Sequence, residues 1–303
     1  MRETSEASSI RVGLVLAVAG TALFAMKSIF IKLAYAKGID TVTLLTLRML
    51  IAMPIYAAIL IWLLKHQNFG KPIPNGKPLG GILLLGFIGY YLSSFLDMEG
   101  LNHITAQLER LTLYTYPIMT TLLGWLFLKE VINRYIIAAL ILTYSGIMVI
   151  YAQESFAGNA NTHLGVALVM MSALSYSIYV VSSKPVIQKF GSRMFTSIVM
   201  LASTGFVFVH FLLTHHIGNL LIQTDAWLYA FLLAIFSTVL PSYIMAEVIS
   251  RIGASKMSII GTLGPLFTIL IAIIVLNEPF GWAHFIGLLL VVGGVSLLGK
   301  KVS

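Results

Sequence analysis

The chain has 303 residues, of which 58% are hydrophobic and only 10% charged, and its mean hydropathy is +0.94. A water-soluble domain of this length could not shield so much apolar surface from water, so we expect an integral membrane protein. The sequence contains no cysteine, which excludes disulfides, thiolate metal sites and thiol nucleophiles, and its net charge of +8 does not indicate a nucleic-acid partner, because the basic residues follow the ends of apolar segments.

The predicted elements are apolar runs, each close to the roughly 20 residues that a helix needs to cross about 30 Å of hydrocarbon. In chain order we place membrane-spanning helices at residues 12–34, 43–64, 79–98, 104–128, 132–151, 165–183, 194–214, 225–246, 257–276 and 282–299. Short polar segments separate these runs, and none is long enough for a soluble domain. The predicted fold class is therefore all-α integral membrane, with ten transmembrane helices.

Lysine and arginine orient these helices, because basic residues near short loops stay on the cytoplasmic side of a membrane. With the N-terminus inside, fourteen of the 19 Lys and Arg residues fall in inside segments, two fall outside, and Lys27, Arg48 and Arg110 fall within spans. This alternation predicts that both termini are cytosolic. The compact loops indicate a bacterial protein of the cytoplasmic (inner) membrane.

An internal repeat divides the chain. A shift of 152 residues superposes the segment that starts at Gly13 on the one that starts at Gly165, and PIMTTLLGWLFLKE, from Pro117 to Glu130, parallels PLFTILIAIIVLNE, from Pro265 to Glu278. We therefore predict two five-helix units, residues 1–151 and 152–303. Because five is odd, the second unit enters the membrane from the opposite side, and inverted repeats of this kind are typical of alternating-access transporters.

These motifs resemble those of the drug/metabolite transporter superfamily, EamA type. The resemblance rests on the repeated pattern of Pro, apolar run and Leu-x-Glu, on Leu47-Arg48 in the second span, and on the basic residues Lys32 and Lys184 that end the first span of each half. It implies transport of an organic solute without naming which one. Lys27, Glu109 and Arg110 depart from the common pattern, which makes them candidates for substrate selection.

Charged residues inside the spans are the first candidates for a binding site, because each costs about 2.5 to 3.5 kcal/mol at a helix centre on insertion scales. The candidates are Lys27, Arg48, Glu109 and Arg110, with Asp97 and Glu99 at the outer end of the third span. In one interpretation Lys27 and Arg110 hold an anionic group and Glu109 holds a cationic group or a proton. In the other, the charges only form ion pairs that join helices.

Tyrosines and prolines supply the remaining candidates. Helical spacing predicts that Tyr90, Tyr114, Tyr176 and Tyr179 line the cavity, although aromatic residues also fill cores and interfacial belts. Pro117 and Pro265 are expected inside spans, where each frees a carbonyl and either acts as a gate hinge or sets a static bend. With Asp97 and Glu99 they form the candidate coupling and gating set, whereas Glu130 and Glu278 are expected to cap helix ends.

The predicted function is secondary transport of a small polar or zwitterionic organic metabolite, such as an amino acid or a related compound. The sequence has no HExxH, GxSxG or GxxxxGKS motif, so we expect no enzyme activity, no metal site and no cofactor. The expected partners are the lipid bilayer and a small-molecule substrate, with a proton as a candidate second ligand and no nucleic acid. A polytopic intramembrane enzyme or a passive channel-like subunit is the alternative, and the oligomeric state is left open.

Overall fold

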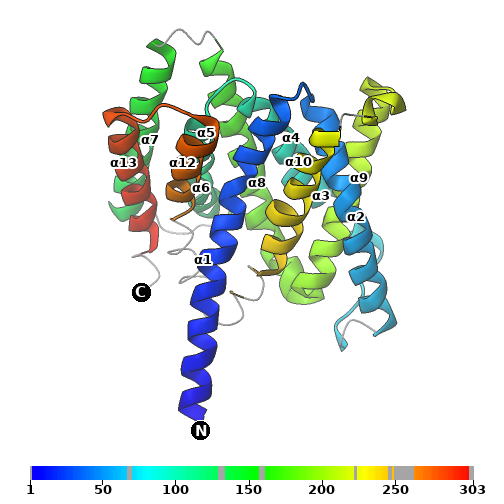
Figure 1. The fold of residues 1–303 in the computed structure, drawn as a ribbon. Helices are drawn as coiled ribbons and strands as arrows, with labels where there is room; N and C mark the ends of the chain where they lie inside the picture. The colour runs from blue at the N-terminus through cyan, green and yellow to red at the C-terminus, as the bar shows by residue number, and fades with distance from the viewer. Residues whose placement is uncertain are drawn as a thin grey trace.

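The computed structural model describes residues 2–66, 70–128, 134–156, 161–221, 224–244, 248 and 263–299, and this part of the chain is helical with short connections (Figure 1). Its helices are α1 (Arg2–Tyr35), α2 (Thr41–Lys65), α3 (Gly76–Gly86), α4 (Ser93–Leu101), α5 (Ala106–Leu113), α6 (Tyr116–Leu128), α7 (Arg134–Phe156), α8 (Thr162–Phe190), α9 (Ser192–Thr214), α10 (Thr224–Ala234), α12 (Gly264–Leu276) and α13 (Trp282–Gly299). Two π-helical stretches, η2 (Phe87–Leu92) and η4 (Ile235–Val239), continue α3 and α10, and a 3₁₀ turn, η3 (Ile217–Leu220), follows α9.

The helices have the length and surface of membrane spans. Seven helical segments within the described residues are long and apolar enough to cross a bilayer: Val12–Tyr35, Thr41–Lys65, Gly76–Leu101, Ile137–Ser155, Thr162–Ser183, Ser192–Thr214 and Ala226–Ile244. Two shorter apolar helices, Gly264–Leu276 and Trp282–Leu297, accompany them. Large apolar side chains such as Leu213, Ile274 and Trp282 are at least 76% exposed, as lipid-facing residues are. The protein is therefore an all-helical membrane protein, as its composition predicts.

The predicted fourth span, residues 104–128, is not one helix. It consists of α5 and α6, separated by a turn in which the N–H and the hydroxyl of Thr115 both donate to the Thr112 carbonyl, at 3.1 and 2.8 Å. Pro117 lacks an N–H and cannot bond to the carbonyl of Leu113, four residues earlier, so the α-helical ladder cannot continue through this point. Proline therefore produces a break here where a bend was expected.

Helices from the two halves of the sequence pack against each other in matching pairs. The helix α2 packs against α9, and α7 packs against α13. The helix α1 contacts α12 and α10, while α8 has the corresponding contacts with α6 and α3. In Figure 1, α1 and α8 pass through the middle of the molecule, with α7 and α13 on one side and α2 and α9 on the other. These contacts between the two halves of the sequence thus occur in matching pairs.

The two π-helical stretches also correspond. The stretch η2 starts at Phe87 and η4 starts at Ile235, so they are 148 residues apart, the same separation as Pro117 and Pro265. A serine hydroxyl anchors each region to a helix of the other half. Ser175 of α8 donates to the Ile88 carbonyl at 2.7 Å, and Ser237 of η4 donates to the Leu23 carbonyl of α1 at 3.2 Å.

Glycines allow the closest helix contacts. A Cβ atom placed on Gly146 of α7 would lie 2.7 Å from the carbonyl oxygen of Gly287 of α13. A Cβ on Gly100 of α4 would lie 2.9 Å from the carbonyl oxygen of Gly165 of α8. These backbones touch directly, so any side chain at these positions would push the helices apart.

Candidate functional site

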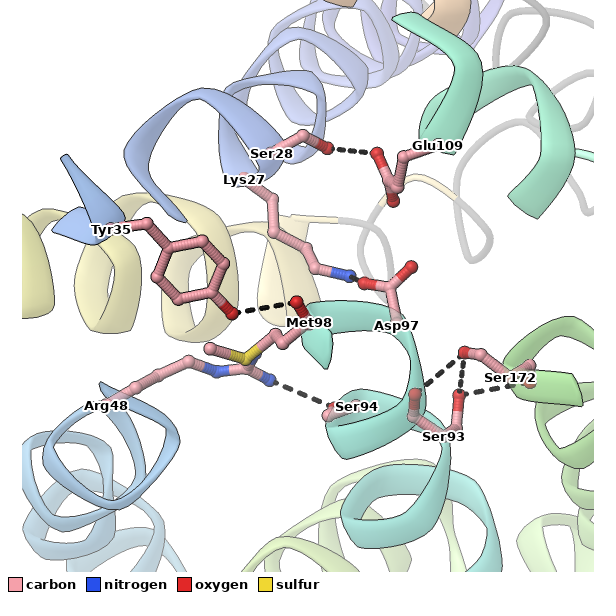
Figure 2. A network of polar contacts seen from close by, with 10 residues as sticks. All are labelled: Lys27, Ser28, Tyr35, Arg48, Ser93, Ser94, Asp97, Met98, Glu109 and Ser172. Carbon is pink, nitrogen blue, oxygen red and sulfur yellow. Dashed lines mark hydrogen bonds and ion pairs between the residues drawn. The ribbon is translucent and has the colours of Figure 1, made fainter. Parts of the chain in front are cut away.

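Lys27 of α1 and Asp97 of α4 form an ion pair in the interior of the molecule. The ammonium of Lys27 donates to Asp97 Oδ2, and Figure 2 shows the two side chains pointing toward one another. The Asp97 side chain is 2% exposed, whereas that of Lys27 is 17% exposed. Lys27 is therefore the more accessible member of the pair.

Glu109 of α5 lies beside this ion pair. Its side chain is fully buried, and its Oε2 accepts a hydrogen bond from Ser28 of α1 at 2.5 Å. The carboxylate interacts electrostatically with Asp97, Lys27 and Arg110. Glu109 Oε1 and Asp97 Oδ1 are both buried and have no hydrogen-bond partner among the described residues. Three helices thus bring two carboxylates to one ammonium.

Two buried arginines flank the acidic residues. Arg48 of α2 is 5% exposed and makes only long contacts, from Nη2 to Ser94 Oγ at 3.5 Å and from Nη1 to Met98 Sδ at 3.8 Å. Arg110 is 8% exposed, and a Cβ placed on Gly264 would lie 3.2 Å from its Nη2, so its guanidinium lies against the first turn of α12. The Nε atoms of both arginines lack a hydrogen-bond partner in the described part of the chain.

The four predicted tyrosines lie together. The ring of Tyr90 meets that of Tyr179 edge-on, with centroids 5.2 Å apart, and Tyr179 stacks on Tyr176 at 5.6 Å. Tyr116 then connects Tyr176 to Tyr114, at 5.4 and 6.3 Å. The structure therefore joins η2, α8 and the break between α5 and α6 through one continuous row of rings.

Tyr116, Ser28 and Met98 contact the candidate residues, and the sequence analysis did not select them. Tyr116 falls off the helical stripe through Tyr114 because that stripe assumes an uninterrupted helix. Its proximity to Pro117 was the available signal, since a proline break resets the rotation of the chain. The sequence around Ser28 and Met98 carries no such signal, because serine and methionine are common in apolar helices.

The remaining candidate residues lie apart from the ion pair. Glu99 accepts a hydrogen bond from Thr41 at 2.6 Å and is 34% exposed, which places it in a separate polar group at the end of α4. Pro117 and Pro265 occupy the second positions of α6 and α12. Both prolines thus begin helices, where their fixed backbone angle is favourable, and neither lies in a helix interior as we expected.

Glu278 caps a helix that is distant in sequence. Its carboxylate accepts hydrogen bonds from the backbone N–H groups of Ala106 and Gln107 at 2.7 and 3.2 Å, at the first turn of α5. Glu154 of α7 accepts from the backbone N–H and the hydroxyl of Thr105 at the same end. Negative charge is favourable at a helix N-terminus, so capping accounts for Glu278. Glu130 lies outside the described residues.

A pocket of about 410 Å³ opens at this capped end and is lined by residues that include Lys32, Asn102, Thr105 and Glu278. It does not include Lys27, Asp97 or Glu109. Within the described ranges, no three His, Asp or Glu side chains gather as a metal site would require.

Comparisons with known proteins agree with this architecture. Residues 11–152 and 163–300 each match the EamA-like transporter family. The chain is similar to "Uncharacterized transporter YcbK" of Bacillus subtilis, with 27% identity over 298 residues that cover 94% of this chain and 92% of the relative. It is also similar to an "Uncharacterized transporter" of Archaeoglobus fulgidus, with 22% identity over 282 residues that cover 92% and 94% of the two chains.

A solved structure described only as "Crystal structure of protein" has the same fold. Its TM-score to this chain is 0.63 at 16% identity, and the match covers 96% of this chain and 97% of that one. Because the two family matches span most of the sequence, the chain belongs to the EamA-like transporter family and is a multi-pass membrane transporter, not an enzyme.

Proposed function

We propose that the chain is a secondary carrier that moves a small polar or zwitterionic organic metabolite, such as an amino acid, across the cytoplasmic membrane by alternating access. It consists of two inverted five-helix repeats, residues 1–151 and 152–303, and both termini lie in the cytosol. Counting α5 with α6 as one discontinuous crossing, and α12 as the described part of another, gives ten crossings.

The reciprocal packing of the two halves is the observation that carries this proposal. The pairs α1 with α12 and α8 with α6 correspond, as do α10 with α1 and α3 with α8. The π-helical stretches recur with the same separation as the prolines. A repeat that packs on its own counterpart can exchange two equivalent arrangements, which is the basis of alternating access.

The chemistry of the interior supports a solute with groups of both signs. Lys27 and Arg110 offer positive charge, Glu109 and Asp97 offer negative charge, and the tyrosine row supplies an aromatic wall. Ion pairing alone does not account for the arginines, because no ion pair joins Arg48 or Arg110 to a carboxylate among the described residues. A buried guanidinium without a carboxylate favours a ligand that supplies one.

Counterflow in proteoliposomes tests the carrier. Vesicles loaded with a mixture of unlabelled amino acids are diluted into a trace of each labelled amino acid in turn. A carrier takes up its labelled substrate transiently above the equilibrium level, whereas a channel gives simple equilibration. Equilibration without overshoot for every amino acid would contradict the proposal for this class of solute, and the same assay with sugars or nucleosides would then define the class.

A further inference from the structure

The carboxylates next to Lys27 outnumber the ammonium that pairs with them. Two carboxylates, Asp97 and Glu109, lie against one ammonium, and each carboxylate has one oxygen satisfied and one oxygen without a partner in the described chain. Figure 2 shows the free oxygen of Glu109 on the side that faces Asp97. Two ionised carboxylates this close in a low-dielectric interior repel each other, and a proton between them replaces that repulsion with a hydrogen bond.

The other described cations act on these carboxylates only from beyond ion-pair distance. Arg110 acts on Glu109 from the same helix, Arg48 acts on Asp97 from α2, and Lys32 acts on Glu109 from one turn along α1. Two other helices that pack against α5 offer no charge, because residues 164–183 of α8 and all of α12 contain no charged residue. The titratable groups on the remaining two are engaged elsewhere: Glu154 of α7 accepts a hydrogen bond from Thr105, and His284 of α13 accepts one from the Gly281 N–H. The Lys27 ammonium is the only described group in ion-pair contact with either carboxylate.

We propose that Asp97 and Glu109 form a proton-binding site whose occupancy depends on Lys27, so that the carrier binds one proton together with the anionic group of its solute. This inference rests on the proposed carrier function. With Lys27 paired to Asp97, the two carboxylates hold one proton and one negative charge. When Lys27 turns to a solute carboxylate, that charge loses its cation, and the pair takes a second proton from water. The proton leaves when the solute leaves and Lys27 returns.

The exposure of the residues suits this exchange. Lys27 is the least buried member of the group and has a flexible side chain, whereas Asp97 and Glu109 are buried and cannot turn to water without moving helices. The solute therefore reaches the ammonium first, and the carboxylates respond through the loss of their partner.

Infrared difference spectroscopy of the purified protein in lipid tests the site without a known solute. A protonated carboxyl group has a carbonyl band that is separate from the band of a carboxylate. We expect this band in the wild type at neutral pH, and we expect its loss in both Glu109→Gln and Asp97→Asn. Glu154→Gln, which removes a buried carboxyl outside the group, serves as the control and retains the band.

The Lys27 variants test the dependence on the cation. Lys27→Met removes the charge, so the pair holds two protons and the amplitude of the band rises about twofold at neutral pH. Lys27→Arg keeps a cation and the wild-type amplitude. If the wild type lacks the band, if Glu109→Gln retains it, or if Lys27→Met leaves its amplitude unchanged, the proposal is wrong. The first two outcomes decide the matter even if Lys27→Met does not fold.

A pH gradient tests coupling separately from transport. In proteoliposomes, an amino acid that shows counterflow is supplied on both sides, and a gradient of one pH unit is imposed. One coupled proton gives about tenfold accumulation on the alkaline side at equilibrium. Counterflow without accumulation would reject the coupling and leave the carrier in place. A band that titrates with pH, in a protein that shows no counterflow of any solute, would support the proton site and contradict the carrier function.

Discussion

At the scale of single residues, the Lys27–Asp97 pair shows that a charged side chain in a membrane interior needs a partner of opposite charge. The Asp97 side chain is 2% exposed, and the Lys27 ammonium that pairs with it comes from another helix. Removing one member of a buried pair leaves an uncompensated charge, whereas removing both leaves an apolar contact.

We therefore expect Lys27→Met to lower the free energy of unfolding by about 3 to 5 kcal/mol near neutral pH. Lys27→Met combined with Asp97→Leu should be more stable than Lys27→Met alone. Denaturant unfolding of the purified variants measures these differences, and strictly additive effects would contradict the pairing.

Gly264 keeps the space that Arg110 occupies. In Gly264→Ala, the new methyl group would lie 3.2 Å from Arg110 Nη2, so the guanidinium must move by a few tenths of an ångström. We expect a several-fold higher KM for transport with little change in thermal stability. Gly205→Ala is the matched control, because a Cβ there has no atom within 4 Å. Equal KM values for both variants would show that Arg110 does not position the solute.

Asp40 gives a pH dependence outside the membrane spans. Its carboxylate caps α2 by accepting a hydrogen bond from the Thr43 N–H at 3.0 Å. Burial opposes its ionisation, but Thr43 and the nearby His215 together outweigh burial, so the pKa of Asp40 is lowered in the folded protein. Its stabilisation is therefore present above the unfolded pKa of about 4 and is lost as pH falls through the lower folded value.

The variant Asp40→Ala should cost about 1 kcal/mol of stability at neutral pH, because the cap is lost. Asp40→Asn keeps an acceptor for Thr43 and should cost less. Thermal unfolding between pH 3 and pH 7 measures both, and a difference from wild type that persists unchanged at the acidic end would contradict the role of ionised Asp40.

At the scale of elements, sequence periodicity predicts where helices run but not where they are interrupted. The apolar runs give the spans because burial in lipid requires about 20 apolar residues. The break at Tyr114–Thr115 is marked only by the nearby Pro117, and the π-helical stretches leave no trace in the apolar pattern. Regular helical spacing would place Gly86 on one face with Tyr90 and Asp97, whereas a Cβ on Gly86 would lie 2.8 Å from the Val199 carbonyl oxygen of α9.

The candidate site was easier to predict than its geometry. Charge inside a span identified Lys27, Arg48, Glu109 and Arg110, because such residues are expensive in lipid. Which carboxylate forms an ion pair with Lys27 depends on the rotation of α1, α4 and α5 about their own axes, which the sequence does not give. The structure pairs Lys27 with Asp97 of α4 and not with Glu109 of α5.

The contact between α7 and α13 depends on glycine. In Gly287→Ala, the methyl group would lie 2.5 Å from Ile150 Cδ1 and 2.9 Å from the Gly146 carbonyl oxygen. We expect a loss of about 1 to 3 kcal/mol from overpacking. Gly293→Ala, in the same helix and with no atom within 4 Å, should be neutral or slightly stabilising. Thermal unfolding in detergent compares the two variants. Equal stability would show that α7 and α13 can move apart without loss of stability.

At the scale of the whole molecule, the inverted arrangement requires both termini on one side of the membrane. The chain contains no cysteine, so single cysteines can be introduced without a background. We expect an impermeant maleimide to label Lys37→Cys from outside intact cells. Lys71→Cys and Ser303→Cys should react only after the cells are opened. Labelling of Ser303→Cys from outside would place the termini on opposite faces and exclude two inverted repeats.

One irregular stretch decides where the acidic half of the site points. A π-helical turn contains more residues than an α-helical turn, and each additional residue rotates everything beyond it by roughly 100°. Gly86, before η2, faces α9, whereas Ser94 and Asp97, after it, face α2 and α1. Deleting one residue between 87 and 92 would restore regular winding and turn Asp97 away from Lys27. The site could thus be abolished with all of its own side chains still in the chain.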